Sequence, residues 1–275
     1  MSVKASSAVR AVRQDVRMVD DVRPVLVTGG TGTLGRALVH TLLDAGRPVR
    51  VLSRREPSPA VPDAVEWVVG DLLTGDGLHE AVTGVSAVVH CATDPRKPDD
   101  DLDAAVQLLL AARAASVPHL LYVSIVGVDR VPFAYYKAKH RVEEIVEDGG
   151  VPWTILRATQ FHEFARQIFD QFRLGPIALV PRMVSQPVAA REVAERLVSL
   201  AEGAPAGHAT ELGGPEVLRM STMVKMYARA IGSRGPVLEL PLPGGFGRAM
   251  RDGTVLSGPA ADRGIQTYDE WVATL

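Results

Sequence analysis

The sequence predicts an α/β fold: a doubly wound parallel sheet with helices on both faces and a smaller, less regular cap at the C-terminal end. From residue 24 onward, short runs rich in Val, Ile and Leu alternate with segments of helical period. The strand-like runs are apolar nearly throughout, which is typical of strands buried on both faces. The chain has 275 residues and is 47% hydrophobic, so it can enclose a full core. A repeated strand-then-helix order indicates parallel strands, because each connection must cross back over the sheet.

Six strands and four helices make up the first part of this pattern. The predicted strands are PVLVTG (24–29), PVRVLSR (48–54), VEWVVGD (65–71), SAVVHCA (86–92), HLLYVSI (119–125) and WTILRA (153–158). The predicted helices between them are RALVHTLLDAG (36–46), DGLHEAVTG (76–84), DLDAAVQLLLAARAAS (101–116) and YKAKHRVEEIVEDGG (136–150). Several of these helices end in glycine, a common C-terminal signal.

After about residue 160 the rhythm loosens into segments that contain Pro and Gly. Two helices, AAREVAERLVSLAEG (189–203) and MSTMVKMYARAIG (220–232), and one further strand within GHATELGGP (207–215) are predicted here. We therefore expect the core of the fold over 23–160, and the remaining sheet elements with a substrate-binding cap over 161–275. The cap should pack against the carboxyl ends of the strands, where open α/β sheets bind their ligands.

Residues 1–22 are predicted to be a flexible leader or a short helical arm. They hold arginines, small residues and valines at helical spacing, but no apolar stretch of the kind that a secretory signal requires.

Composition narrows the range of partners. The net charge is −2 with acidic and basic residues interspersed, so no basic patch for nucleic acid or an anionic membrane is predicted. No apolar run is long enough to span a bilayer. A single cysteine, Cys91, excludes an internal disulfide and a cysteine-cluster metal site. We expect a cytoplasmic protein, monomeric or homodimeric, that binds a small-molecule substrate and no metal, nucleic acid or membrane.

A glycine-rich turn follows the first predicted strand. Gly29, Gly32 and Gly35 form a TGxxGxxG pattern in which the glycines allow a tight turn, approach to a pyrophosphate and close helix packing. The helix that begins near Thr33 offers free N–H groups and its positive dipole end to phosphates. The pattern predicts a dinucleotide site of the Rossmann type, with Thr28 and Leu34 at its edges.

The end of the second strand favours NADP(H) over NAD(H). An acidic residue there would accept from the ribose 2′-OH, whereas arginine accommodates a 2′-phosphate. The sequence has Ser53, Arg54 and Arg55 at this position, and a guanidinium suits phosphate geometry. Glu56 argues against the preference for NADP(H), because a small shift in strand register would bring its carboxylate near the ribose. Asp71, at the end of the third strand, either accepts from the adenine amino group or forms a simple turn.

The stretch FAYYKAKHR (133–141) contains a candidate catalytic pair. Tyr135 and Lys139 are four residues apart, so they share one helix face, and the lysine would favour the phenolate. The alternative is an ordinary helix surface. Tyr136 lies three residues before the same lysine and is a second candidate. His140, Glu143 and Glu144 are expected to form a solvated face rather than a metal site.

The chain resembles the short-chain dehydrogenase/reductase superfamily, and within it the atypical, NmrA-like branch. The resemblance runs from about residue 24 to the end. It rests, in order, on TGGTGTLG, VLSRR, GDL, YVSIVG, YYKAK, WTILRATQF, PVAAREVAE and LGGPE. It implies a reductase site made of Ser124, Tyr135 and Lys139. In that site the tyrosine donates a proton to the reduced carbonyl and the lysine binds the nicotinamide ribose.

The same resemblance extends the cofactor groove. Beyond the glycine turn, we assign to it Leu72, Cys91, Ala92, Thr93, Lys139, Thr159 and Phe161. Gln160 would border the nicotinamide with them, and His162 is an accessory proton donor. The apolar stripe from Phe161 to Phe172 is more typical of a core than of a pocket.

Two departures from the family pattern bear on mechanism. The fourth strand ends in HCAT, where many members carry Asn-Asn-Ala-Gly, and the chain contains no asparagine. A proton relay through asparagine is therefore excluded.

The sequence favours an NADPH-dependent reductase of a small apolar or aromatic carbonyl, enone or quinone-like substrate. Two alternatives stay open: a regulator that senses NADP(H) without turnover, and an epimerase, dehydratase or cyclase on the same scaffold.

Overall fold

A computed structural model describes residues 23–59 and 61–275, so the interpretation of residues 1–22 lies outside the described residues. A parallel sheet dominates it, with the strand order β14-β11-β6-β5-β4-β1-β2-β3 and β10 also paired with β6. Its strands are β1 (Val25–Thr28), β2 (Val49–Ser53), β3 (Val65–Val69), β4 (Ala87–His90), β5 (Leu120–Ile125), β6 (Trp153–Ala158), β10 (Gly207–His208), β11 (Leu212–Gly213) and β14 (Asp262–Arg263). The predicted fold class is confirmed.

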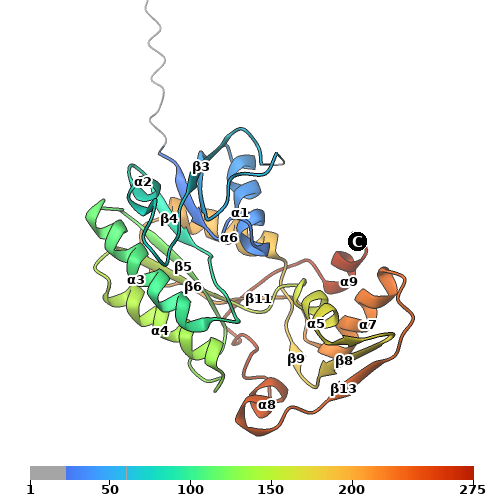
Figure 1. Cartoon of the computed structure of the whole chain (residues 1–275). Helices are drawn as coiled ribbons and strands as arrows, with labels where there is room; N and C mark the ends of the chain where they lie inside the picture. The colour runs from blue at the N-terminus through green and yellow to red at the C-terminus, as the bar shows by residue number, and fades with distance from the viewer. Residues whose placement is uncertain (1–22, 60) are drawn as a thin grey trace, which may run out of the picture.

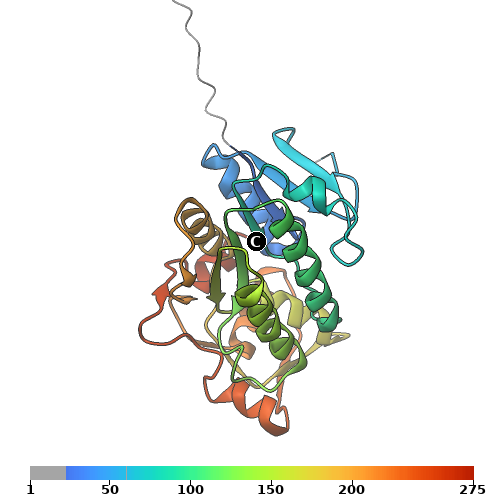
Figure 2. The same cartoon turned by 90° about the vertical axis from the view of Figure 1, so that its left-hand side faces the viewer.

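Helices cover both faces of this sheet. On one face α1 (Thr33–Asp44) packs against α6 (Ala190–Glu202); the other carries α2 (Leu78–Val82), α3 (Pro98–Ala114) and α4 (Ala134–Asp148). Figure 2 shows α3 and α4 side by side in front of the sheet. The inner strands β1 and β4 are buried along their whole length, as their mainly apolar sequences predict, and the polar residue at the end of each, Thr28 and His90, is buried as well.

A second group of elements makes up the C-terminal region (Figure 1). It contains α5 (Phe164–Phe172), β7 (Arg173–Leu174), β8 (Ile177–Pro181), β9 (Val184–Ser185), β12 (Leu218–Arg219), α7 (Met220–Ala230), β13 (Val237–Leu240), α8 (Gly244–Arg251) and α9 (Tyr268–Val272). Buried apolar residues of α5, β8, α7, α8 and α9 form a second core there. The stripe on α5 is mainly core: Ile168 and Phe169 are buried, whereas Phe172 is exposed. None of the helices in the described part of the chain is long and apolar enough to cross a membrane.

Element boundaries differ from the sequence prediction at several places, including the following three. The helix expected from residue 101 begins at Pro98, because proline is well suited to the first helical position. The helix expected from residue 136 begins at Ala134, after an extended residue at Phe133. The segment 207–215 forms two short strands instead of one, and both pair with β6.

Candidate functional site

The glycine turn lies where the strand order reverses. β1 pairs with β2 on one side and with β4 on the other, so the carboxyl end of β1 is the switch point at which such sheets bind dinucleotides. Gly29 has φ +70°, and a Cβ there would lie 2.6 Å from the backbone nitrogen of Ala92. A Cβ on Gly35 would overlap the carbonyl oxygen of Gly29. These two glycines are therefore required by the turn and by close packing of α1.

Gly32 differs from these two glycines, because the space beside it is open. Apart from its chain neighbours, the Gly29 carbonyl oxygen at 3.3 Å is the single described atom within 4 Å of a Cβ built there. Gly32 also precedes α1 without a side-chain cap, which leaves the amides of Thr33 and Leu34 free for a ligand. Arg36, which the sequence analysis did not single out, donates to the Thr31 carbonyl at 2.5 Å beside this turn. The residues present therefore fit a pyrophosphate.

The two arginines after β2 lie on the surface of the protein. Arg54 and Arg55 are both exposed, and within residues 23–59 and 61–275 neither forms a salt bridge. Ser53 accepts from the Arg55 amide at 3.3 Å. Asp71 accepts from the Leu73 amide at 2.9 Å, which is the turn that the sequence left as one alternative. Leu72 is half-buried beside it.

A row of polar side chains crosses the sheet below the switch point. Thr28, His90 and Tyr122 are adjacent in register on β1, β4 and β5. The Thr28 hydroxyl lies 2.7 Å from His90 Nδ1, and the His90 ring stacks on Tyr122 with centroids 5.6 Å apart. Burial, with a contribution from Lys139, lowers the pKa of His90 to about 3. His90 is therefore neutral at physiological pH.

Lys139 ends this row. It is buried on α4, and its Nζ donates to Tyr122 Oη at 2.9 Å. Burial alone would lower the pKa of Lys139, but Tyr122, Tyr135 and Asp101 together raise it above its usual range, so the ammonium keeps its charge. Burial also raises the pKa of Tyr122 to about 12, against the opposing effect of Lys139. The alternative of an ordinary helix surface is therefore wrong for Lys139, because its side chain is buried.

The two neighbouring tyrosines have different surroundings. Tyr135 is half-buried, with its ring 5.7 Å from Lys139 Nζ and its hydroxyl 3.5 Å from Thr93 Oγ1. Tyr136 is buried in the C-terminal core and accepts from Gln160 Nε2 at 3.5 Å. Of the two, Tyr135 combines partial exposure with the charge of Lys139.

Thr93 links Tyr135 to a buried carboxylate. The Thr93 hydroxyl donates to Asp101 Oδ2 at 2.5 Å, and the Asp94 amide donates to the other carboxylate oxygen at 2.9 Å. Because the single hydroxyl proton of Thr93 goes to Asp101, its oxygen can accept from Tyr135. Ser124 is buried beside this region, two residues after Tyr122 on β5, and its Oγ has no hydrogen-bond partner among the described residues.

Several of the other residues that the sequence assigned to a cofactor groove have contacts that serve the fold. Thr159 is buried, donates to the Gln186 carbonyl at 2.5 Å and accepts from the Gly214 amide at 3.3 Å. Cys91 and Phe161 are half-buried against the core beneath α1. Ala92 approaches the glycine turn through its backbone, as noted above.

His162 is buried rather than open to a substrate. Its ring is 0% exposed and lies 5.6 Å from Tyr268 and 5.7 Å from Trp271, centroid to centroid. Burial lowers the pKa of His162 to about 4. In this position the ring has no access to a substrate, so its expected role as accessory proton donor is wrong.

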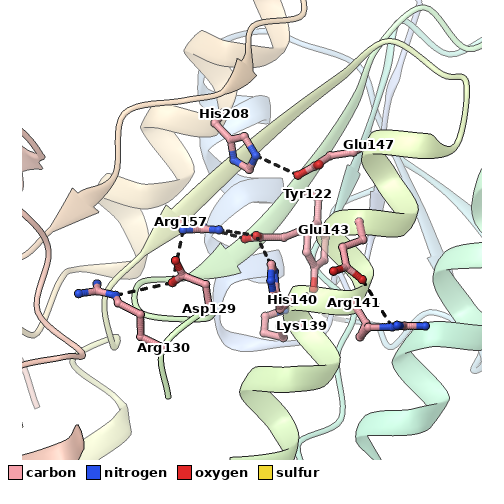
Figure 3. A network of polar contacts seen from close by, with 11 residues as sticks. Tyr122, Asp129, Arg130, Lys139, His140, Arg141, Glu143, Glu147, Arg157 and His208 are labelled. Carbon is pink, nitrogen blue, oxygen red and sulfur yellow. Dashed lines mark hydrogen bonds and ion pairs between the residues drawn. The ribbon is translucent and has the colours of Figure 1, made fainter. Parts of the chain in front are cut away.

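A charge network fixes α4 against β6. Arg157 donates to Glu143 through Nε at 2.9 Å and through Nη2 at 2.6 Å, and the Glu143 side chain is only 1% exposed. Figure 3 shows the guanidinium between Glu143 and Asp129, with His140 on the same carboxylate. The prediction of a solvated face is wrong for Glu143. The helix sequence by itself does not show that Arg157, on β6, lies against this carboxylate in the fold.

In residues 23–59 and 61–275, no group of three or more His, Cys, Asp or Glu side chains is arranged to hold a metal ion.

The sheet order and the open glycine turn define an α/β protein that binds a dinucleotide. A family model described as NAD(P)H-binding matches residues 29–201, and the chain belongs to this family. The resemblance to atypical short-chain dehydrogenases/reductases is thus confirmed at family level.

Three comparisons place the chain among known proteins. It is 33% identical over 214 residues to a (4-alkanoyl-5-oxo-2,5-dihydrofuran-3-yl)methyl phosphate reductase of Streptomyces griseus, covering 76% of this chain and 74% of that protein. It is 28% identical to a photosystem II assembly factor of Trieres chinensis, covering 58% of this chain and 52% of that protein. A solved Agrobacterium tumefaciens short-chain dehydrogenase/reductase superfamily protein with bound NAD shares the fold, with a TM-score of 0.66, 21% identity and coverage of 91% and 95%.

Proposed function

We propose that this protein is an NADPH-dependent reductase of a small, apolar, conjugated carbonyl compound. The observation that carries the proposal is the half-buried Tyr135 beside a buried, charged Lys139 at the carboxyl edge of the sheet. A tyrosine next to a fixed cation is suited to giving up a proton, because the cation stabilises the phenolate that remains.

The chain's own residues supply binding and proton transfer. The amides of the glycine turn and of Thr33 bind the pyrophosphate, and Lys139 binds the nicotinamide ribose. The bound cofactor supplies the hydride. Tyr135 Oη donates the proton that completes the reduction after hydride transfer. The hydroxyl of Ser124 donates a hydrogen bond to the substrate oxygen. Thr93 accepts the hydrogen bond from Tyr135 when no substrate is bound, and the substrate oxygen replaces Thr93 as the acceptor.

The conjugated carbonyl of the proposed substrate rests on the similarity to the Streptomyces griseus reductase. That protein's name describes an alkanoyl dihydrofuranone that carries a methyl phosphate ester, and in this compound a carbonyl is conjugated with a carbon–carbon double bond. Reduction of such an enone adds hydride to the distal carbon, and the resulting enolate needs a proton donor. The same site would reduce quinone-like compounds, in which the acceptor is again a conjugated carbonyl.

The test is consumption of NADPH by the purified protein. We expect oxidation of NADPH with at least one member of a panel of cyclic enones, alkanoyl butenolides with and without the phosphate, naphthoquinones and aromatic ketones. The product should gain one deuterium from the labelled cofactor and one proton from solvent. Tight binding of NADPH without turnover of any compound would contradict the reductase proposal.

Substitutions at the two tyrosines test the proton donor. Tyr135→Phe should lower kcat by roughly a hundredfold while cofactor affinity stays nearly unchanged, because only the hydroxyl is removed. Tyr136→Phe is the matched control and should stay within about twofold of the unmodified protein. Lys139→Met should lower both kcat and NADPH affinity. Loss of activity in Tyr136→Phe with Tyr135→Phe intact would transfer the role to Tyr136.

Cofactor preference is assigned to the arginines after β2. Replacing Arg54 and Arg55 with Ala should weaken NADPH binding by roughly tenfold to a hundredfold and leave NADH binding unchanged, since a charge-assisted phosphate contact contributes about 1.5–3 kcal/mol. Arg191→Ala, an exposed arginine on α6, is the control. Calorimetric titration of both cofactors measures this, and equal affinities in the unmodified protein would contradict the preference.

A cofactor-sensing role without turnover is the second candidate. It is favoured by the similarity to the photosystem II assembly factor of Trieres chinensis, whose name describes assembly rather than catalysis. In that case Tyr135→Phe would have no consequence, and NADPH and NADP+ would change the binding of a protein partner. Pull-down with each cofactor form distinguishes this role from a reductase.

A further inference from the structure

Lys139 is held from beneath by a tyrosine of the sheet. Its Nζ lies 2.9 Å from Tyr122 Oη and 4.7 Å from the centre of the Tyr122 ring. Both side chains are almost completely buried, with exposed fractions of 5% for Lys139 and 1% for Tyr122. The chain contains no asparagine, so no asparagine side chain takes part in this contact.

The contact with Tyr122 uses one of the hydrogen-bond donors of the Lys139 ammonium. An ammonium has three N–H donors and no acceptor, and Tyr122 takes one of them. The ring of Tyr135, 5.7 Å from Nζ, is a second aromatic neighbour of the same ammonium. Lys139 can therefore keep its contact with Tyr122 while its remaining donors reach a ribose hydroxyl.

Tyr122 is itself fixed by its neighbours in the sheet. The ring stacks on His90, and His90 is bonded to Thr28 at 2.7 Å. A phenol held in this way is a rigid acceptor, whereas a free lysine side chain has four rotatable bonds and loses more entropy when a ligand fixes it.

We propose that Tyr122 is a positioning residue that holds the Lys139 ammonium in place for cofactor binding and for stabilising the Tyr135 phenolate. This inference rests on the proposed function, because it concerns the same site. Tyr122 acts through Lys139 and touches neither substrate nor the reacting atoms.

The charges around Lys139 determine what the loss of the Tyr122 hydroxyl does. The titratable groups that face it are Tyr122 and His90 from the sheet, Tyr135 from its own helix and Asp101 from α3, with Cys91 nearby. In Tyr122→Phe, Asp101 and Tyr135 remain, so Lys139 keeps its charge but loses its fixed acceptor. The ammonium is then displaced from the position that stabilises the Tyr135 phenolate.

The decisive experiment compares Tyr122→Phe with Tyr136→Phe. Both remove one hydroxyl from a buried tyrosine, but Tyr136 contacts Gln160 rather than Lys139. We expect Tyr122→Phe to fold, to lose roughly tenfold to a hundredfold in kcat and to bind NADPH more weakly, while the KM for the carbonyl substrate stays nearly unchanged, because only the position of the Lys139 ammonium is disturbed. Tyr136→Phe should leave kcat and NADPH affinity unchanged. Unchanged kcat and NADPH affinity in Tyr122→Phe would overturn the proposal.

A double-substitution cycle separates positioning from general loss of structure. Once Lys139→Met has removed the ammonium, adding Tyr122→Phe should change kcat and NADPH affinity less than twofold. If Tyr122→Phe acted through a general structural defect, the fold-losses of the two single variants would multiply in the double variant, because independent free-energy changes add. That result would overturn the proposal. NADPH affinity is read by titration without turnover, so this arm still gives a result if no tested compound is reduced and the reductase proposal fails.

Discussion

Removal of the Glu143 carboxylate should destabilise the protein far more than removal of an exposed carboxylate. The Glu143 side chain is 1% exposed and accepts two hydrogen bonds from the Arg157 guanidinium, at 2.9 and 2.6 Å. Arg157 is itself four-fifths buried, and Asp129 lies 3.7 Å from its Nη1. Glu143→Ala would leave this cation without its main partner.

The size of the effect follows from burial. Breaking a buried ion pair by removing one partner costs about 3–5 kcal/mol, because the remaining charge is left uncompensated. Asp129 and partial exposure offset some of this cost, so we expect about 3 kcal/mol at position 143. Glu195→Ala is the matched control: Glu195 pairs with Arg191 on the surface of α6, with side chains 52% and 76% exposed. Such a pair contributes about 0.3–0.5 kcal/mol.

These differences are measured by urea unfolding of the two variants and the unmodified protein, followed by circular dichroism. The difference in unfolding free energy is obtained from the shift in the urea midpoint, provided that the dependence of free energy on urea concentration is the same for all three proteins. A loss below about 1 kcal/mol in Glu143→Ala, or a loss equal to that of Glu195→Ala, would refute the reasoning. Glu143→Gln keeps the shape and one acceptor, so it should fall between the two.

Two further predictions concern the glycine turn and pH. Gly32→Val should fold but lose NADPH binding by titration, because the space beside Gly32 is open, whereas Gly35→Val should fail to fold, because a Cβ there overlaps the Gly29 carbonyl. Normal NADPH binding by folded Gly35→Val would contradict this. The pKa of His90 is lowered from 6.5 to about 3 in the folded protein, so at pH values between these two the unfolded chain binds a proton on this histidine and the folded chain does not. The free energy of unfolding therefore falls as the pH drops below 6.5. Between pH 7 and pH 5 this histidine should account for a loss of about 2 kcal/mol in urea unfolding, which His90→Gln would not show; equal losses in both proteins would contradict it.

The fold and the cofactor turn were predictable from the sequence because their signals are local. Apolar runs specify buried strands, and the turn from Gly29 to Gly35 carries its chemistry in its own spacing. The C-terminal region was predicted less completely. Strands β8 and β13, which pair over four positions, come from segments more than fifty residues apart, and neither carries a local signal that identifies its partner.

The polar row beneath Lys139 was not predictable, because it depends on register across the sheet. Thr28, His90 and Tyr122 lie in three separate strands, and each is an ordinary residue within an apolar run. The one available signal was the position of Tyr122 two residues before Ser124, which places both on the same face of a strand. The role of Asp101 could not be predicted from the sequence either. Acidic residues are common in the first turn of a helix, where they interact favourably with the helix dipole, so nothing distinguished Asp101 from its acidic neighbours.

The face of α4 that meets the sheet explains why this helix can look like a surface helix and still be partly buried. Tyr135, Lys139 and Glu143 are spaced by four residues and lie along one face. Lys139 is bonded to Tyr122 on β5 and Glu143 to Arg157 on β6, so partners on two adjacent strands compensate the charges of this face. Because both contacts hold the same helix, loosening the Glu143 contact should also shift Lys139. Glu143→Gln should therefore weaken NADPH binding as well as stability, although Glu143 does not touch the cofactor groove. Unchanged NADPH affinity in a destabilised Glu143→Gln would show that the two contacts act independently.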